Sequence, residues 1–338
     1  MIPLTVPRPR WQHELQQAIT DPAELLALLE LDAAALPPLR ATTDFPLRVP
    51  RGFVARMRKR DPADPLLRQV LPLAVEDAPA PGFVADPVGD LASAAGPGLL
   101  HKYHGRVLLV ATGACAVHCR YCFRRHFPYA DENPRPEEWR DALDYIRADA
   151  SIAEVILSGG DPLSLSDRRL AALAHVIASI PHVRRLRIHT RQPVVLPERI
   201  DAAFLGWFAP LRLEKVVVVH ANHANEINAQ VAEAFAALKD AGAALFNQSV
   251  LLAGVNDSVA ALADLSEALF AAGAIPYYLH LLDRVAGAAH FEVPETHALT
   301  LHAKLRARLA GYLVPRLVRE EPGKDSKTPV AEVAAEIH

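Results

Sequence analysis

The sequence predicts an α/β fold in which six strand–helix units form an incomplete, TIM-like (βα)6 barrel behind an N-terminal helical extension. From residue 107 onward, short apolar runs typical of buried strands alternate with stretches of helical periodicity. Such alternation is typical of parallel sheets with helical crossovers. Six units, rather than the eight of a closed barrel, indicate a barrel that is open on one side.

The composition is that of a globular enzyme. The 338 residues are 51% hydrophobic, which is enough for one large domain or two. The formal charge of −3 gives no sign of a large nucleic-acid footprint. The N-terminus lacks the apolar stretch of a secretory signal, and no run approaches the roughly 18 apolar residues of a membrane span. We therefore expect a cytoplasmic protein without membrane or nucleic-acid partners.

The N-terminal extension is rich in proline. Thr20 or Asp21 is expected to cap a helix that has Pro22 in its first turn, and short helices are expected near 50–60 and 64–71. A basic cluster in this part is interpreted as a solvated helix face, with a nucleic-acid patch as the alternative. The cluster comprises Arg56, Arg58, Lys59 and Arg60.

Residues 101–315 are assigned to the barrel, between the extension at 1–100 and a C-terminal segment at 316–338. Its strands are expected at 107–111, 154–157, 183–190, 215–220, 244–252 and 275–282. Its helices are expected at 167–180, 198–208, 225–241, 258–272 and 295–312.

All the cysteines of the chain lie within eight residues, as Cys115, Cys119 and Cys122. Their odd number rules out a purely internal disulfide framework, and their clustering indicates a metal site. Three thiolates can hold a cluster of four irons while one iron keeps a position open for substrate or cofactor. The alternative is a structural zinc with His118 or His126 as its fourth ligand.

Polar residues and a pair of glycines lie at the ends of the predicted strands. Functional groups gather at the carboxyl ends of the strands in parallel barrels, so we expect these residues to face one cavity. For each residue alone, the alternative is a satisfied polar group in the core. The residues are Gly159, Gly160, Asp161, Arg191, His220, Asn222, Gln248, Ser249, His280 and Asp283.

The two glycines do not have the spacing of a phosphate-binding loop. They are interpreted as a place where the backbone closely approaches a ligand, with a tight strand-to-helix turn as the alternative.

The cysteine spacing, with Tyr121 before the last cysteine, resembles the radical S-adenosylmethionine (SAM) superfamily. The resemblance implies a radical SAM barrel with a [4Fe–4S] cluster whose open iron binds the amino and carboxylate groups of SAM. It also implies a reducing electron donor and cleavage of SAM to methionine and a 5′-deoxyadenosyl radical. The residues that would contact SAM are Tyr121, Gly159, Gly160, Asp161, His220 and Gln248.

Several segments between about residues 50 and 330 are similar, in order, to the lysine 2,3-aminomutase family. Members use a cluster, SAM and pyridoxal phosphate (PLP) together to move an amino group from the α to the β carbon. The segments include HKYHGRVL at 101–108, CFRRHF at 122–127, SGGDPL at 158–163, RQPVVLP at 191–197, NQSVLL at 247–252 and KTPV at 327–330.

The resemblance also implies the residues that hold PLP. Lys327 matches the lysine that binds PLP covalently. Lys324 is the alternative, because the family's run of glycines is replaced in this segment. Lys102 and Arg191 match the cations at the PLP phosphate, with Tyr103 alongside, although arginine is usual at position 102.

The same resemblance implies L-lysine as the substrate. Arg124 matches the partner of the substrate carboxylate. Asp283 and Glu320 match acidic partners of the distal ammonium, where a glutamate aminomutase would want a cation.

Within the family, Trp11 and the segment TDPAELL at 20–26 resemble the elongation factor P β-lysylation branch. Clostridial-type members carry extra cysteines that bind a structural zinc between subunits, and Ser258 stands at one of those positions. In the elongation factor P branch, L-lysine becomes (R)-β-lysine, which a separate ligase attaches to elongation factor P. A homo-oligomer is left open. The alternatives are free β-lysine for metabolism, a radical SAM enzyme that modifies RNA, and a non-catalytic iron–sulfur or zinc module.

Overall fold

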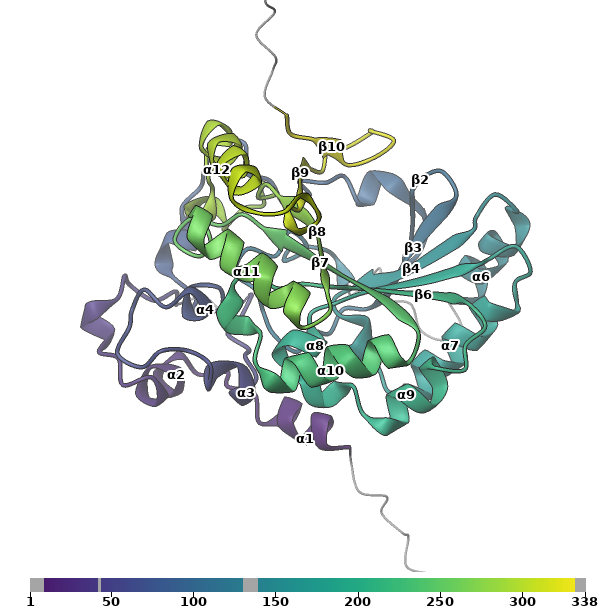
Figure 1. Cartoon of the computed structure of the whole chain (residues 1–338), viewed down its shortest axis with the longest axis horizontal. Coiled ribbons are helices and arrows are strands. Elements are labelled where there is room, and N and C mark those ends of the chain that lie inside the picture. Colours follow the sequence, from purple (N-terminus) through teal and green to yellow (C-terminus); the bar gives the residue numbers. More distant parts are fainter. Residues whose placement is uncertain (1–8, 42–43, 130–138, 332–338) are drawn as a thin grey trace, which may run out of the picture.

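The computed structural model describes residues 9–41, 44–129 and 139–331 (Figure 1). Within these residues, a ten-stranded sheet contains its strands in the order of the chain. Strands β3 to β9 run parallel to one another, whereas β1, β2 and β10 are antiparallel additions at the two ends of the order. The strands are β1 (Ala94–Gly96), β2 (Leu99–Tyr103), β3 (Arg106–Thr112), β4 (Glu154–Gly159), β5 (Arg185–Thr190), β6 (Glu214–Val219), β7 (Ala243–Val250), β8 (Ile275–His280), β9 (Arg316–Arg319) and β10 (Thr328–Pro329).

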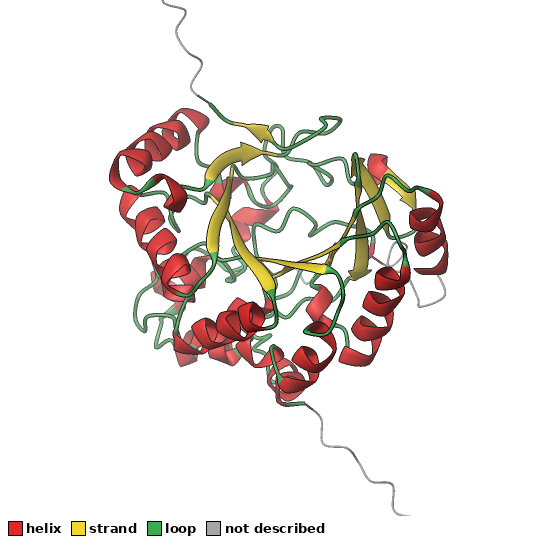
Figure 2. Cartoon of the chain, turned by 45° about the vertical axis from the view of Figure 1, so that its right-hand side comes forward, coloured by secondary structure: helices red, strands yellow, loops and turns green. Residues whose placement is uncertain are grey.

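Six helices follow the six parallel strands β3 to β8 and lie outside the sheet. Figure 2 shows the strands curving around an interior, with the helices on the outer side. Among the described strands, β1 and β10 end the order without pairing to each other, so the barrel is open as predicted. The helices are α6 (Trp139–Ala148), α7 (Asp167–Ser179), α9 (Ala202–Phe208), α10 (Ala229–Asp240), α11 (Val259–Ala271) and α12 (Glu295–Arg308).

Two strands of the barrel, β4 and the second half of β6, are buried on both faces. Every residue of β4 is buried, and the last three residues of β6 are buried valines. Strands buried on both faces have continuous apolar runs rather than alternation, which explains why the sequence revealed them. Helix side chains pack on the outer face of the same strands, including Trp139, Leu170, Phe204, Phe235 and Leu269.

The sequence did not predict α6 or the strands at the ends of the sheet. The end strands β1, β2, β9 and β10 are only two to five residues long, too short to show a periodic pattern. The helices expected near 50–60 and 64–71 are also short, as α3 (Arg51–Val54) and α4 (Pro65–Arg68). β9 and β10 matter for function because they bring the C-terminal segment into the sheet.

The extension packs beneath the loop that carries the cysteines. Helices α1 (Arg10–Gln16) and α2 (Pro22–Leu28) precede α3 and α4, and the Asp21 carboxylate caps α2 by accepting from the Ala23 N–H. These elements share one apolar cluster with Ala116 and Val117 of the cysteine loop. The extension therefore supports the metal-binding loop directly.

The basic cluster is solvated only in part. Arg58, Lys59 and Arg60 are exposed and pair with nearby acids. Arg56 is different: its guanidinium donates to the carbonyls of Val194 and Glu226, and burial lowers its pKa to about 10. The interpretation of a solvated face is therefore wrong for Arg56, which joins the extension to the barrel. No helix in the described ranges is long and apolar enough to cross a membrane.

Candidate active site

One cavity of about 540 Å³ lies inside the barrel at the carboxyl ends of the strands. Every residue that the sequence assigned to the cluster, to SAM, to PLP or to the substrate lines this cavity. Segments more than 200 residues apart in the chain therefore meet there, as the carboxyl-end rule for parallel barrels predicts. Two of the residues expected to face the cavity, Asn222 and Ser249, do not line it. They are buried polar groups that donate to the Tyr121 hydroxyl and to the Ala221 carbonyl.

The three cysteines follow β3 in a partly buried loop and line one end of the cavity. Burial, together with the charge of the neighbouring Cys119, raises the pKa of Cys122 to about 11. Burial and the charge of Cys122 also raise the pKa of Cys115. Thiols that oppose one another's ionisation need positive charge to become thiolates, and a cluster of irons supplies it. The donor set fits a [4Fe–4S] cluster with one open iron.

The histidines proposed as zinc ligands have other partners. His118 contacts the Pro46 carbonyl through Nδ1 at 2.8 Å and stacks on Phe45. His126 contacts the Ala286 carbonyl through Nε2 at 3.0 Å. In the described part of the chain, no three His, Cys, Asp or Glu side chains are arranged to hold a single metal ion.

The two glycines at the end of β4 allow the backbone to pack against the cysteine loop. Gly159 has φ +114°, and a Cβ at Gly160 would lie 2.6 Å from the Ala114 carbonyl oxygen. The Gly160 and Asp161 N–H groups donate to the carbonyls of Thr112 and Ala114, at 2.7 and 2.8 Å. The two glycines therefore closely approach the backbone of the cysteine loop, and their approach to a ligand stays a prediction.

We expect Gly160→Ala to disrupt the cysteine loop, because its methyl group would overlap a backbone oxygen that cannot move independently. The expected cost is about 1–3 kcal/mol of stability, with loss of iron after anaerobic reconstitution. Thermal unfolding and iron content measure the two effects. The matched control is Gly206→Ala in α9, where an added Cβ meets nothing within 4 Å. Normal iron content in Gly160→Ala would contradict this account.

Asp161 ties the ends of β4 and β5 together. Its carboxylate accepts from the Thr190 hydroxyl and from the backbone N–H groups of Leu163, Arg191 and Gln192, at 2.7 to 3.1 Å. The residue is buried, and these contacts occupy both of its carboxylate oxygens.

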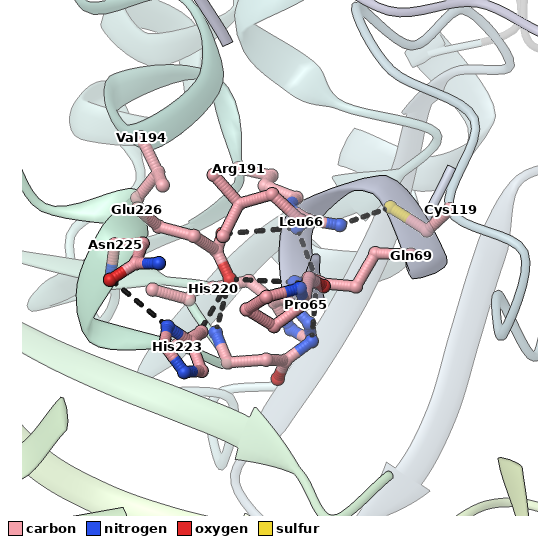
Figure 3. A network of polar contacts seen from close by, with 12 residues as sticks. Pro65, Leu66, Gln69, Cys119, Arg191, Val194, His220, His223, Asn225 and Glu226 are labelled. Carbon is pink, nitrogen blue, oxygen red and sulfur yellow. Dashed lines mark hydrogen bonds and ion pairs between the residues drawn. The ribbon is translucent and has the colours of Figure 1, made fainter. Parts of the chain in front are cut away.

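A buried polar network surrounds the Arg191 guanidinium (Figure 3). Arg191 donates to the Cys119 sulfur, to the Tyr121 hydroxyl at 2.7 Å and to the Glu226 carboxylate at 3.0 Å. Gln69 of the extension accepts from Arg191 at 2.7 Å and donates to Glu226 at 3.1 Å. The structure thus places Arg191, expected at the PLP phosphate, at the cysteine end of the cavity. Sequence reasoning missed Gln69 and Glu226, both fully buried.

His220 and Gln248 lie beside this network. The His220 ring stacks on Tyr121, and its Nε2 lies 2.9 Å from the Tyr121 hydroxyl. Burial and the nearby Arg191 charge lower the His220 pKa to about 3, so the imidazole is neutral. The Gln248 side chain makes no hydrogen bond to any described residue, which leaves its amide available to a ligand.

Charged residues of alternating sign form the opposite wall. The Arg124 Nε and the Lys102 Nζ each lie 2.7 Å from one oxygen of Asp90, and Lys102 is 3.9 Å from Glu320. Glu320 accepts from the Tyr103 hydroxyl and, at 2.6 Å, from the Lys327 Nζ. Burial alone would raise the pKa of Glu320, but Lys327 and Tyr103 hold it below its ordinary value.

The lysine alternatives differ in position. Lys327 follows β9 in the sheet, lines the cavity and lies 6.0 Å above the Tyr278 ring. Lys324 is exposed and is not among the residues that line the cavity. A lysine amine in the cavity with an acidic partner, near the cation Lys102, fits the needs of PLP. The geometry therefore favours Lys327 over Lys324.

The Asp283 carboxylate faces the same cavity and makes no hydrogen bond to any described residue. Burial and the nearby Glu320 charge raise its pKa to about 7, against the opposing effect of Lys327. Such a carboxylate is ready to receive a cation.

Comparison with known proteins agrees with this arrangement. A model of the radical SAM superfamily matches residues 109–265. The L-lysine 2,3-aminomutases of Escherichia coli K12 and Haemophilus influenzae are 50% and 48% identical to the chain. These matches cover 96% and 95% of the chain and 96% of each relative. The L-lysine 2,3-aminomutase of Clostridium subterminale is 38% identical over 82% of this chain and 67% of the relative. At these identities and coverages, the chain belongs to the lysine 2,3-aminomutase family of radical SAM isomerases.

Proposed function

We propose that the chain converts L-α-lysine to (R)-β-lysine, which a separate ligase then attaches to elongation factor P. The distribution of charge in the cavity is the observation that carries this proposal. A cation, Arg124, lies on one part of the wall, while the acids Asp283 and Glu320 lie near Lys327. Lysine has a carboxylate at one end and an ammonium at the other, and this arrangement pairs both.

The cofactors are those of the family: a [4Fe–4S] cluster, SAM and PLP. Bound together, they supply an adenosyl radical and a carbonyl that holds the substrate amine. Cys115, Cys119 and Cys122 would hold the cluster. Lys327 and Lys102 would hold PLP.

The other residues orient the substrate. Arg124 would pair with the lysine carboxylate through its Nη2, which has no acceptor among the described residues. Asp283 and Glu320 would hold the distal ammonium. The cavity lies between the sheet and the cysteine loop, so these contacts would fix the lysine β carbon where its hydrogen can be removed.

The near full-length similarity to the Escherichia coli and Haemophilus influenzae relatives supports the elongation factor P branch. Ser258, at the position of a zinc-binding cysteine in clostridial-type members, caps α11 by accepting from the Ala261 N–H. We place the reaction in the cytoplasm, because thiolate ligands and a reducing electron donor need a reducing compartment.

The configuration of the product tests the branch. Anaerobically reconstituted protein is given SAM, PLP, a strong reductant and L-lysine, and the products are separated on a chiral phase with mass detection. (R)-β-lysine is the expected product. (S)-β-lysine would contradict the elongation factor P branch and support production of free β-lysine for metabolism.

The raised pKa of Asp283 predicts a pH dependence of lysine binding. An ionised Asp283 attracts the substrate ammonium, whereas a protonated one does not. The KM for lysine is therefore expected to be constant above about pH 7 and to rise by up to tenfold per pH unit below it. Asp283→Asn is expected to raise KM about 100-fold at pH 8 and to remove this dependence. An unchanged pH profile in the Asn variant would contradict the role of Asp283.

A further inference from the structure

Asp90 is a buried carboxylate in the cavity that belongs to none of the sequence motifs. It is 2% exposed and lies in the loop before β1. The Asp86 carboxylate accepts from the Asp90 N–H at 3.0 Å and from the Leu91 N–H at 3.1 Å. Gly89, at φ +64°, packs against Pro322, so an added Cβ there would lie 3.1 Å from the proline side chain. The loop is thus held by its own hydrogen bonds and packs against the C-terminal segment.

Each oxygen of Asp90 holds a different cation. Oδ1 lies 2.7 Å from the Lys102 Nζ, and Oδ2 lies 2.7 Å from the Arg124 Nε. Burial alone would raise the pKa of Asp90, but Arg124 and Lys102 hold it below its ordinary value. The carboxylate therefore stays ionised and joins the two cations rigidly.

Asp90 leaves a donor free on each cation. Lys102 also donates to the Val88 carbonyl at 2.7 Å, which leaves a third N–H for the cavity. Arg124 uses Nε on Asp90 and Nη1 on Ser158, and its Nη2 has no acceptor among the described residues. If Asp90 competed with bound anions, its carboxylate would cover the free N–H groups of Lys102 and Arg124. It binds other N–H groups of the two side chains and so orients the free ones.

We propose that Asp90 is a positioning residue that sets the spacing between the anchor of the PLP phosphate, Lys102, and the anchor of the substrate carboxylate, Arg124. This inference rests on the proposed function. One rigid carboxylate between the two anchors fixes how the substrate lies relative to PLP. Without it, Lys102 is free to move toward Glu320, 3.9 Å away, and to compete there with Lys327. Misplaced anchors lower kcat as well as affinity.

The test is Asp90→Asn, which keeps the size of the side chain and removes its charge. PLP, SAM and lysine are titrated on the reconstituted enzyme, PLP by its visible absorption. We expect about tenfold weaker PLP binding, a higher KM for lysine and a lower kcat, with SAM affinity unchanged. The matched control is Asp86→Asn in the same loop, which keeps a carbonyl oxygen for its cap and does not line the main cavity. It should bind PLP like the parent.

A double variant covers the case in which Asp90→Asn fails to fold because a buried ammonium loses its partner. Asp90→Asn with Lys102→Met removes both charges and should bind PLP no more weakly than Lys102→Met alone, since Asp90 acts through Lys102. Additive losses would overturn the inference, and so would tighter PLP binding in Asp90→Asn, which would make Asp90 a competitor of the phosphate. If the parent protein itself binds no PLP, the proposed function fails instead.

Discussion

Lys327→Ala is expected to lower the rate of lysine isomerisation by at least about a thousandfold and to abolish covalent PLP binding. The Lys327 amine lies in the cavity, 2.6 Å from Glu320, and no other described lysine except Lys102 lines it. Lys102 has partners in Asp90 and the Val88 carbonyl, so it is not available to replace Lys327. The mass of the protein after borohydride reduction measures covalent PLP, and chromatography measures β-lysine.

The control for this prediction is Lys324→Ala, three residues earlier in the same segment. Lys324 is exposed, and its removal should leave PLP binding, iron content and β-lysine formation unchanged. SAM binding should be unchanged in both variants, because the residues expected to contact SAM lie toward the cysteine end of the cavity. If Lys324→Ala lost PLP and Lys327→Ala kept it, the assignment of the two lysines would be reversed.

Glu226→Gln is expected to destabilise the protein by about 3–5 kcal/mol, because it leaves the buried Arg191 guanidinium without its anionic partner. Glu226 also accepts from Gln69 and from the N–H groups of Asn222 and His223. All of its partners are donors, so the NH2 group of a glutamine would face a donor that it cannot bind. The loss should extend to iron binding, since Arg191 donates to the Cys119 sulfur. Urea unfolding and iron content measure the two effects.

Glu214→Gln is the control for the buried network. Glu214 pairs with Arg185 at the surface, where its side chain is 64% exposed, and surface pairs contribute at most about 1 kcal/mol. Its iron content should equal that of the parent. A loss of stability in Glu226→Gln no larger than in Glu214→Gln would show that the network does not support the cysteine loop.

The residues that could be predicted from the sequence are those whose role shows in a local sequence pattern. Cys115, Cys119 and Cys122 stand close together in the chain, and the buried strands are continuous apolar runs. The open barrel follows from these strands and their helices. His220 and Asp283 could also be predicted to face the cavity, because each lies at a strand end and a parallel barrel gathers the carboxyl ends of its strands in one place.

Residues that act through long-range contacts were not predictable in the same way. Asp90 and Gln69 lie in the proline-rich extension, where the sequence shows no motif, and they meet their partners only after folding. Arg56 lies within a basic run that is otherwise exposed, and only tertiary contact with Val194 and Glu226 shows that it differs. Nothing local in the sequence indicated that Glu226 pairs with Arg191, 35 positions away in the chain.

Radical isomerisation of lysine is tested most directly by following the hydrogen atom that is removed from the lysine β carbon. Reconstituted protein is given SAM, PLP, a reductant and L-lysine deuterated at the β carbon, and the products are analysed by mass spectrometry. The account predicts β-lysine, deuterium in the adenosyl group, and loss of both signals in Cys119→Ala. Cleavage of SAM with unlabelled 5′-deoxyadenosine and unchanged lysine would contradict the account, because the cluster would then act on a different substrate.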